Sequence, residues 1–169
     1  ISSTAQDMAR WVRFHLNNGA VIRTVRPEDA GEGSSFPLDS TALSDYFPDI
    51  SPAMTGGFRI YPYRDTVRLI SREQMDFLHT GAVKVRQDSS MRRDYGYCWY
   101  VEQNDRYKVI YHTGTTWGFT GVCGFVPELD LGIAILCNSE VSEYARLGLM
   151  RHIIDLYLPG DTLRDWRTE

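Results

Sequence analysis

With 169 residues, the chain has the length of one domain, and two domains with separate cores would be a tight fit. Its composition is 43% hydrophobic and 24% charged, with 14 glycines and 7 prolines, which excludes collagen, long disordered tails and coiled coils. The longest apolar run, Leu131–Cys137, is too short to span a membrane, and a net charge of −4 argues against a nucleic-acid partner.

The first predicted element is a helix over residues 3–16. Apolar residues recur there at the helical spacing, and Thr4 followed by Asp7 resembles a capping box. The run Asn17-Asn18-Gly19 then predicts a left-handed stop.

A long insertion and a second helix are predicted next. From about residue 20 to 70 the periodicity dissolves among prolines and glycines, which predicts an irregular insertion with one short strand at Phe58–Tyr61. The second helix begins after Ser71 as N-cap, with Gln74 three residues on, and Gly81 is expected to end it.

The remaining chain predicts strands and a final helix. Charged residues between Lys84 and Asp94, among them Arg92 and Arg93, predict a solvated connector. The predicted strands form two hairpins and are Tyr95–Val101, Tyr107–Thr113, Phe119–Val126 and Leu131–Cys137. A last helix is expected over Glu140–Leu158, with Tyr144, Leu149, Ile153 and Leu156 on its apolar stripe. This order favours an α+β fold, of the α/β sandwich type, in which helices cover an antiparallel sheet.

Three cysteines, Cys98, Cys123 and Cys137, lie in apolar runs. An odd number without a Cys-x-x-Cys pair argues against a disulfide framework and against a structural zinc site. We therefore predict buried free thiols, and we expect neither a metal nor another cofactor.

The stretch from Tyr111 to Phe119 carries the most chemistry. A strand ends in His112, Thr113 and Gly114, and a turn leads into the next strand. A glycine lets a ligand approach the backbone because it has no Cβ, and the N–H after it can point at an oxyanion. The histidine and the threonine hydroxyl can bind a substrate carboxylate or move a proton. A simple strand-end turn is the competing interpretation.

The same tripeptide also occurs at His79-Thr80-Gly81, at the end of the second predicted helix. There the glycine is expected to stop the helix, and the histidine is expected at the negative end of the helix dipole. We interpret this copy as structural.

Several stretches together resemble the serine β-lactamase and penicillin-binding-protein-like family, in its class C-type branch. Residues 1–11 resemble the helix opening that follows the family's Tyr-x-Asn motif. Tyr95–Trp99 resembles its Tyr-Gly-x-Gly-Trp strand, with Cys98 in place of the second glycine, and His112–Gly114 resembles the Lys-Thr-Gly box in its His-Thr-Gly form. The hairpin that follows matches at Pro127, Glu128, Leu131, Gly132, Ile133 and Asn138.

The resemblance implies an acyl-serine hydrolase acting on a small molecule or peptide: a β-lactam, a D-amino acid peptide or an ester. The implied catalytic residues are His112 and Thr115, and the implied substrate-binding residues are Thr113, Gly114, Thr116 and Trp117. His112 would line the pocket in place of the lysine, and the Thr115 N–H would form half of the oxyanion hole. Thr116 and Trp117 replace small residues, which implies a narrower or more aromatic pocket mouth.

The family's nucleophile motif, Ser-x-x-Lys, is absent, because Gly81 and Asp105 stand three residues before the two lysines, Lys84 and Lys108. No Tyr-x-Asn is present either. We therefore expect the chain to be the C-terminal part of an incomplete β-lactamase-like domain, with the missing N-terminal half as a partner. Alone it would be catalytically inactive and would expose a sheet edge through which it can self-associate.

Two alternatives stay open at this point. The chain can be a non-catalytic module that keeps this wall as a binding or assembly surface. It can also be an independent hydrolase in which His112 acts with an internal serine and aspartate. The family resemblance implies a periplasmic or secreted protein.

Overall fold

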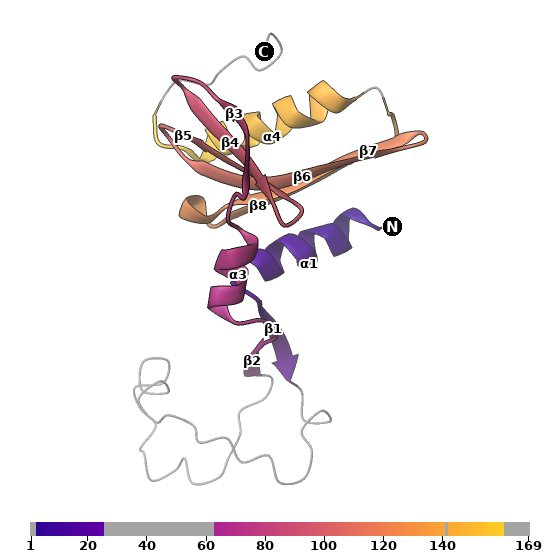
Figure 1. Cartoon of the computed structure of the whole chain (residues 1–169). Coiled ribbons are helices and arrows are strands. Elements are labelled where there is room, and N and C mark those ends of the chain that lie inside the picture. The colour runs from indigo at the N-terminus through magenta and orange to yellow at the C-terminus, as the bar shows by residue number, and fades with distance from the viewer. Residues whose placement is uncertain (1–2, 26–62, 141, 161–169) are drawn as a thin grey trace, which may run out of the picture. The chain divides into compact units, whose positions relative to one another are not determined.

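The computed structural model describes residues 3–25, 63–140 and 142–160. These residues belong to two units, 1–21 with 68–169, and 22–67. The elements of the first unit are α1 (Ala5–Leu16), α3 (Arg72–Leu78), β3 (Val83–Gln87), β4 (Met91–Gly96), β5 (Trp99–Asn104), β6 (Lys108–Thr116), β7 (Phe119–Val126), the 3-10 helix η3 (Pro127–Leu129), β8 (Leu131–Cys137) and α4 (Glu143–Tyr157) (Figure 1). Strands β1 (Ala20–Val25) and β2 (Tyr63–Arg68) pair as a separate two-stranded sheet.

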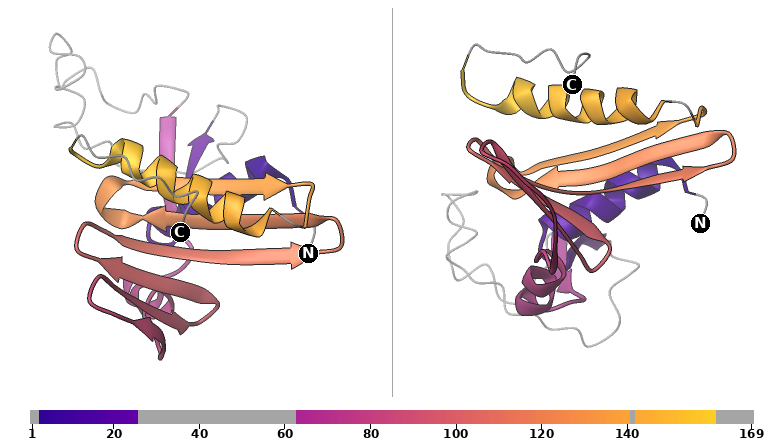
Figure 2. Two further views of the ribbon diagram at one scale, coloured as in Figure 1. Left: turned by 90° about the horizontal axis from the view of Figure 1, so that it is seen from above. Right: turned by 45° about the horizontal axis from the view of Figure 1, so that its top comes forward.

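One six-stranded sheet organises the first unit. Its strand order is β3-β4-β5-β6-β7-β8, and every neighbouring pair is antiparallel. Helices α1 and α4 lie on opposite faces of this sheet (Figure 2). The predicted α+β class, with helices covering an antiparallel sheet, is confirmed.

Each face of the sheet has its own apolar core, because successive side chains of a strand point to opposite sides. In β6, Val109 and Tyr111 join the core under α4, together with Met150 and Ile154 of that helix. Between them, Ile110 joins the core under α1. The members of this second core are Val12, Trp99, Val101, Ile110 and Phe125. Strand β6 is therefore held from both sides along its first half.

The predicted caps of the first two helices are confirmed. Thr4 is the N-cap of α1, and its hydroxyl accepts a hydrogen bond from the Asp7 N–H. Ser71 and Gln74 form a complete capping box at the start of α3. After α1, Asn18 adopts a left-handed φ of 49°, as its stop signal predicts.

Two stretches predicted as irregular contain strands. Both ends of the predicted 20–70 insertion are strands, β1 and β2, and the predicted strand at Phe58–Tyr61 lies outside the described residues. The predicted connector at residues 84–94 is also wrong, because β3 and β4 form a hairpin there. Its charged residues pair with each other and with β5: Arg92 bonds Asp94, and Arg93 bonds Glu102.

The predicted strand Tyr95–Val101 is interrupted by a two-residue turn. Strand β4 ends at Gly96 and β5 begins at Trp99, and the two residues pair directly. Tyr97 and Cys98 between them have φ of 50° and 67°, the left-handed pair that tight hairpins require. Cys98 is consequently exposed rather than buried, while Cys123 and Cys137 are half-buried, and all three thiols are free.

Helix α4 buries a face that differs in part from the predicted stripe. Tyr144, Leu149 and Leu156 are exposed, whereas the buried face holds Arg146, Met150 and Ile154. Their spacing of four residues is helical, but a buried arginine on such a face is unusual because a charge must find polar partners there. The predicted stripe also included Ile153, which does pack against the core, so the apolar pattern found only part of the buried face.

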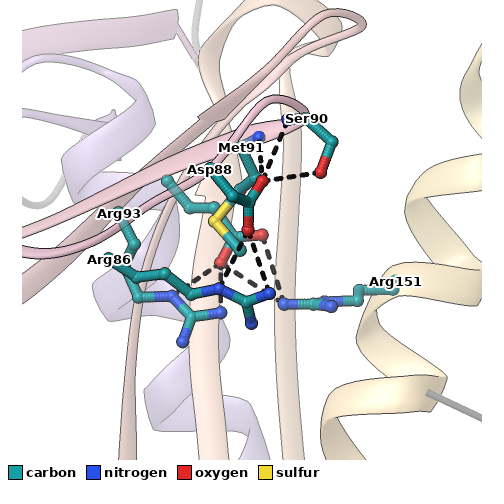
Figure 3. Close-up of polar contacts among 7 residues, drawn as sticks. Arg86, Asp88, Ser90, Met91, Arg93 and Arg151 are labelled. Carbon is teal, nitrogen blue, oxygen red and sulfur yellow. Dashed lines mark hydrogen bonds and ion pairs between the residues drawn. The ribbon is translucent and has the colours of Figure 1, made fainter.

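A buried carboxylate connects α4 to the sheet. Glu102 of β5 accepts hydrogen bonds from Arg93 of β4, at 2.7 Å, and from Arg151 of α4, at 3.2 Å. Figure 3 shows the side chains of Arg93 and Arg151, which come from different elements. The Tyr111 hydroxyl also donates to Glu102, and burial together with this carboxylate raises the pKa of Tyr111 to about 12. Glu102 thus connects α4 to β4 and β6 through charged hydrogen bonds.

None of the helices in the part of the chain that the structure describes is long and apolar enough to cross a membrane.

Candidate active site

Strand β6 loses one of its neighbours halfway along its length. Its pairs with β5 run from Gln103↔Lys108 to Tyr100↔Tyr111 and then stop. Its pairs with β7 continue to Thr116↔Phe119. Within the described residues, His112–Thr116 therefore have a strand on one side only. We call the other side of this segment the free edge.

The backbone groups of the segment alternate between β7 and the free edge. The Gly114 carbonyl accepts a hydrogen bond from the Thr120 hydroxyl of β7, at 2.9 Å, so it points toward β7. Burial raises the pKa of the Cys123 thiol of β7, and the His112 backbone opposite it lowers that pKa in part. Because successive residues of a strand direct their N–H and C=O groups to opposite sides, Thr113 and Thr115 direct theirs to the free edge.

Gly114 leaves open space above this segment. A Cβ built on Gly114 would meet no heavy atom within 4 Å. The described residues thus give no packing reason for a glycine at this position. Open space over a backbone with unpaired donors and acceptors is the arrangement that a closely approaching ligand needs.

His112 stands at the start of the free edge beside two tyrosines. Its Nε2 lies 3.2 Å from the Tyr95 hydroxyl of β4, and its ring lies parallel to that of Tyr100, with 6.0 Å between the centroids. The imidazole is half-buried, and the hydrogen bond fixes its orientation. The predicted Tyr-Gly-x-Gly-Trp stretch therefore contributes Tyr95 to the same site as the His-Thr-Gly stretch.

At the other end of the free edge, the β6–β7 turn presents aromatic side chains to solvent. Trp117 is 90% exposed and Phe119 is 59% exposed. Gly118 between them has a φ of 75°, and its N–H donates to the Glu140 carboxylate at 3.3 Å. The free edge is thus bounded by the Tyr95–His112 pair at one end and by exposed aromatic rings at the other.

The second His-Thr-Gly copy has an entirely different environment. His79 is the C-cap of α3 and is buried, and its Nε2 lies 2.8 Å from Nδ1 of His15. Burial, with Lys108 as a second cause, lowers the pKa of His79 to about 4, so it is not the cation that the helix-dipole interpretation expected. Gly81 does not stop the helix either: a Cβ there would lie 2.2 Å from the Asp94 Cβ, so the close approach of β4 requires the glycine.

The His15–His79 pair lines a cavity of about 450 Å³ near the start of β6. Burial, and then the neighbouring His79, lower the pKa of His15 to about 4 as well. Other lining groups are the polar Asp76, Lys108 and Asp130 and the apolar Leu16, Ile110, Phe125 and Pro127. In the described ranges, no group of three or more histidine, cysteine, aspartate or glutamate side chains is placed to hold a metal ion.

All six residues singled out from the sequence lie on one stretch of β6 and its turn. His112 and Thr113 are half-buried, and Gly114, Thr115, Thr116 and Trp117 are exposed. Their chemical roles stay predictions. The alternative of an independent hydrolase finds no support in the described part of the chain, where the hydrogen-bond partner of His112 is a tyrosine and not a serine.

Sequence reasoning missed the residues that support this stretch. Tyr100 and Tyr95 lie beside His112, and Thr120 and Arg146 lie behind Gly114 and Thr115. Strand register was the available signal, but the predicted strand ended at Thr113, whereas β6 continues to Thr116 and pairs Thr115 with Thr120. Nothing in the sequence pattern distinguished Arg146 from a surface arginine.

One comparison with known proteins identifies a relationship. A family model described as Beta-lactamase matches residues 1–154. No curated protein and no solved structure matches the sequence significantly.

Proposed function

Since this chain belongs to the beta-lactamase family, we propose that its free edge is the substrate-binding wall of a serine hydrolase that works through an acyl-serine. The observation that carries the proposal is the segment His112–Thr116, which has a strand neighbour on one side only and open space over Gly114. The proposed substrates are a β-lactam, a D-amino acid peptide or an ester.

The proposed chemistry follows from the direction of the backbone groups. An extended substrate can align with the free edge and exchange hydrogen bonds with Thr113 and Thr115, as a further strand would. The Thr115 N–H then donates to the carbonyl oxygen under attack, and this bond strengthens as negative charge develops in the tetrahedral intermediate. The Thr113 hydroxyl hydrogen-bonds the substrate, and His112 lines the pocket with its orientation fixed by Tyr95.

The proposal places the nucleophile outside these 169 residues, because the sequence contains neither Ser-x-x-Lys nor Tyr-x-Asn. The N-terminal half of the domain is accordingly the proposed partner. It would supply the serine, the base that activates it and the second oxyanion donor, while these residues supply the wall and the first donor. On this proposal the chain alone binds substrate weakly and does not turn it over.

Labelling with a fluorophosphonate tests the location of the nucleophile. Intact-mass spectrometry is applied to this chain and to a longer protein that contains it. We expect an adduct on the longer protein alone. An adduct on this chain would contradict the proposal and favour a serine within these residues. No adduct on either protein, combined with ligand binding, would favour the non-catalytic binding module.

Binding to the free edge can be tested on the chain itself. We expect millimolar β-lactam or D-alanyl-D-alanine peptide to shift the backbone amide resonances of Thr113 and Thr115. The variant Gly114→Val fills the open space over the edge and should abolish these shifts. The matched control, Gln87→Val, places the same side chain on exposed β3 and should leave them unchanged. Equal shifts in both variants would place binding elsewhere.

Self-association through a sheet edge and a periplasmic or secreted location also remain proposals. The two edge strands differ: β3 carries Lys84 and Arg86 and a shift of register between them, features that oppose edge pairing. Strand β8 carries no charge and pairs with β7 in unbroken register, so it is the proposed edge. Concentration-dependent sedimentation of the wild type against Leu136→Lys, a substitution at an exposed position of β8, tests this, with loss of association expected. The location rests on family membership alone and is tested by cell fractionation.

A further inference from the structure

The peptide group between Gly114 and Thr115 has an anchor at one end. Its carbonyl accepts from the Thr120 hydroxyl at 2.9 Å. A trans peptide is planar and directs its C=O and N–H to opposite sides. Holding the Gly114 carbonyl toward β7 therefore holds the Thr115 N–H toward the free edge.

The Thr120 hydroxyl is fully engaged. A hydroxyl has one proton to donate and two lone pairs to accept with. Since Thr120 gives its proton to Gly114, the 3.1 Å contact with the Thr115 hydroxyl must be a donation from Thr115. The second lone pair receives the Arg146 guanidinium, whose Nη1 hydrogen-bonds this oxygen.

The Thr120 hydroxyl and the Arg146 guanidinium are buried, and a buried hydrogen bond is stronger than one exposed to water. Thr120 is 4% exposed and Arg146 is 1% exposed, on the face of the sheet that α4 covers (Figure 2). A charged donor bound to a hydroxyl oxygen polarises its O–H and strengthens the bond that the hydroxyl donates. The cation on α4 thereby reinforces the anchor on the Gly114 carbonyl.

The anchor adds to the restraint that this peptide receives from the pairing of Gly114 with Gly121 of β7. Gly114 lacks a Cβ, so its backbone has more accessible conformations than that of any other residue type, and its other side has no strand partner among the described residues. An oxyanion donor contributes most when its direction is fixed before the reaction, so that no free energy is lost in turning it.

We propose that Thr120 and Arg146 are positioning residues, which act through the Gly114 carbonyl to fix the Thr115 N–H in the direction of the free edge. Neither touches the substrate. The inference rests on the proposed function, because a fixed N–H at this position matters to the reaction only if acyl transfer takes place at this edge.

Backbone dynamics on the ¹⁵N-labelled chain test the proposal without any turnover. We expect a Thr115 N–H order parameter of about 0.85 in the wild type, the value of rigid backbone. Thr120→Val keeps the shape of the side chain and removes the hydroxyl, and we expect the order parameter of Thr115 to fall below the wild-type value while the pairing with β7 persists. Thr120→Ser restores the hydroxyl and should restore the value. A side chain with a merely structural role would change overall stability but not this one amide.

Two further variants separate the parts of the network. Arg146→Lys keeps the charge but loses the planar fork, and we expect an intermediate order parameter at Thr115. Thr115→Val removes only the donation from Thr115 and should leave the anchor, and the order parameter, intact. An unchanged value in a folded Thr120→Val chain would overturn the proposal.

A measurement on the wild type covers the case in which the Thr120 variants do not fold. A hydroxyl proton held between Thr120 and Gly114 exchanges slowly with water, so we expect its resonance to be visible. A rapidly exchanging Thr120 hydroxyl proton would overturn the proposal. This outcome does not depend on the proposed function. If the Thr115 amide is rigid in a longer protein that fluorophosphonate does not label, the positioning role is upheld and the proposed hydrolase activity is refuted.

Discussion

The chain contains the tripeptide His-Thr-Gly twice, and the two copies lie in opposite environments. At His79-Thr80-Gly81 the histidine is buried against His15, and the glycine is needed because β4 passes within contact distance. At His112-Thr113-Gly114 the histidine is half-buried within β6, and the space that a side chain would occupy at the glycine is empty.

The difference shows how a structural glycine is distinguished from one that serves a ligand. Both lack a side chain, but only Gly81 has a neighbour in the protein that would collide with one. A glycine whose missing side chain leaves open space next to unpaired backbone groups is available to an incoming molecule. The environment of each copy, not its composition, carries the functional information.

The largest expected effect is a fall in the free energy of unfolding at acidic pH, which originates at the His79 copy. In the folded chain, the pKa values of His15 and His79 are lowered to about 4. In the unfolded chain the pKa of an imidazole is 6.5, so it takes up a proton at a pH where the folded pair is still neutral. Between pH 6.5 and 4 the unfolded chain therefore binds more protons, and the free energy of unfolding falls as the pH is lowered. From pH 8 to pH 5 the expected loss is about 2 kcal/mol for each imidazole.

Urea unfolding across this pH range measures the effect. The variant His79→Gln should flatten the dependence, while His112→Gln, the matching change in the other copy, should leave it in place. If the free energy of unfolding depends on pH equally in wild type and His79→Gln, the buried histidine pair is not the source of that dependence.

Exchange of the two glycines for alanine is expected to give the next largest difference. Gly81→Ala forces a Cβ against Asp94 and should lower the free energy of unfolding by about 2–3 kcal/mol. Gly114→Ala meets no atom and should change it by less than about 0.5 kcal/mol, while weakening the binding of ligand at the free edge. Chemical denaturation of both variants checks this, and equal destabilisation would remove the distinction between the copies.

A third position tests the opposite case, a residue that stands where a glycine would be favoured. Cys98 has a φ of 67°, in the left-handed region, and is exposed. Cys98→Gly should relieve backbone strain and raise the free energy of unfolding by about 1 kcal/mol. Cys98→Ser, which keeps the side-chain size, is the control and should leave stability unchanged. A destabilised glycine variant would mean that the turn is not strained.

The smallest effect on stability is expected at the hairpin tip. Trp117 is 90% exposed, so Trp117→Ala should change the free energy of unfolding by less than about 0.5 kcal/mol. If the aromatic ring forms part of the pocket mouth, ligand-induced shifts of Thr115 should nevertheless become weaker in this variant. Tyr144→Ala, an equally exposed aromatic change on α4, should leave those shifts as they are.

Local signals in the sequence predicted the elements that local chemistry determines. Thr4, Ser71 and Gln74 satisfy helix N–H groups a few residues away, and the hairpin of β7 and β8 follows from its turn residues. The order of strand, His-Thr-Gly and turn, together with the family resemblance, selected residues 112–117 as the candidate site. These features depend on neighbours within about four residues, which a sequence displays directly.

Tertiary structure alone decided which residues surround that site and which side of each element is buried. The predicted connector at residues 84–94 is a hairpin whose second strand, β4, pairs with β5, where Arg93 meets Glu102. Arg146 is the most deeply buried charged side chain among the described residues, and it hydrogen-bonds Thr120, 26 residues earlier. The free edge exists because β5 ends opposite Tyr111 while β7 continues. A sequence states where donors and acceptors lie along the chain, but only the register of distant strands decides which of them remain unpaired.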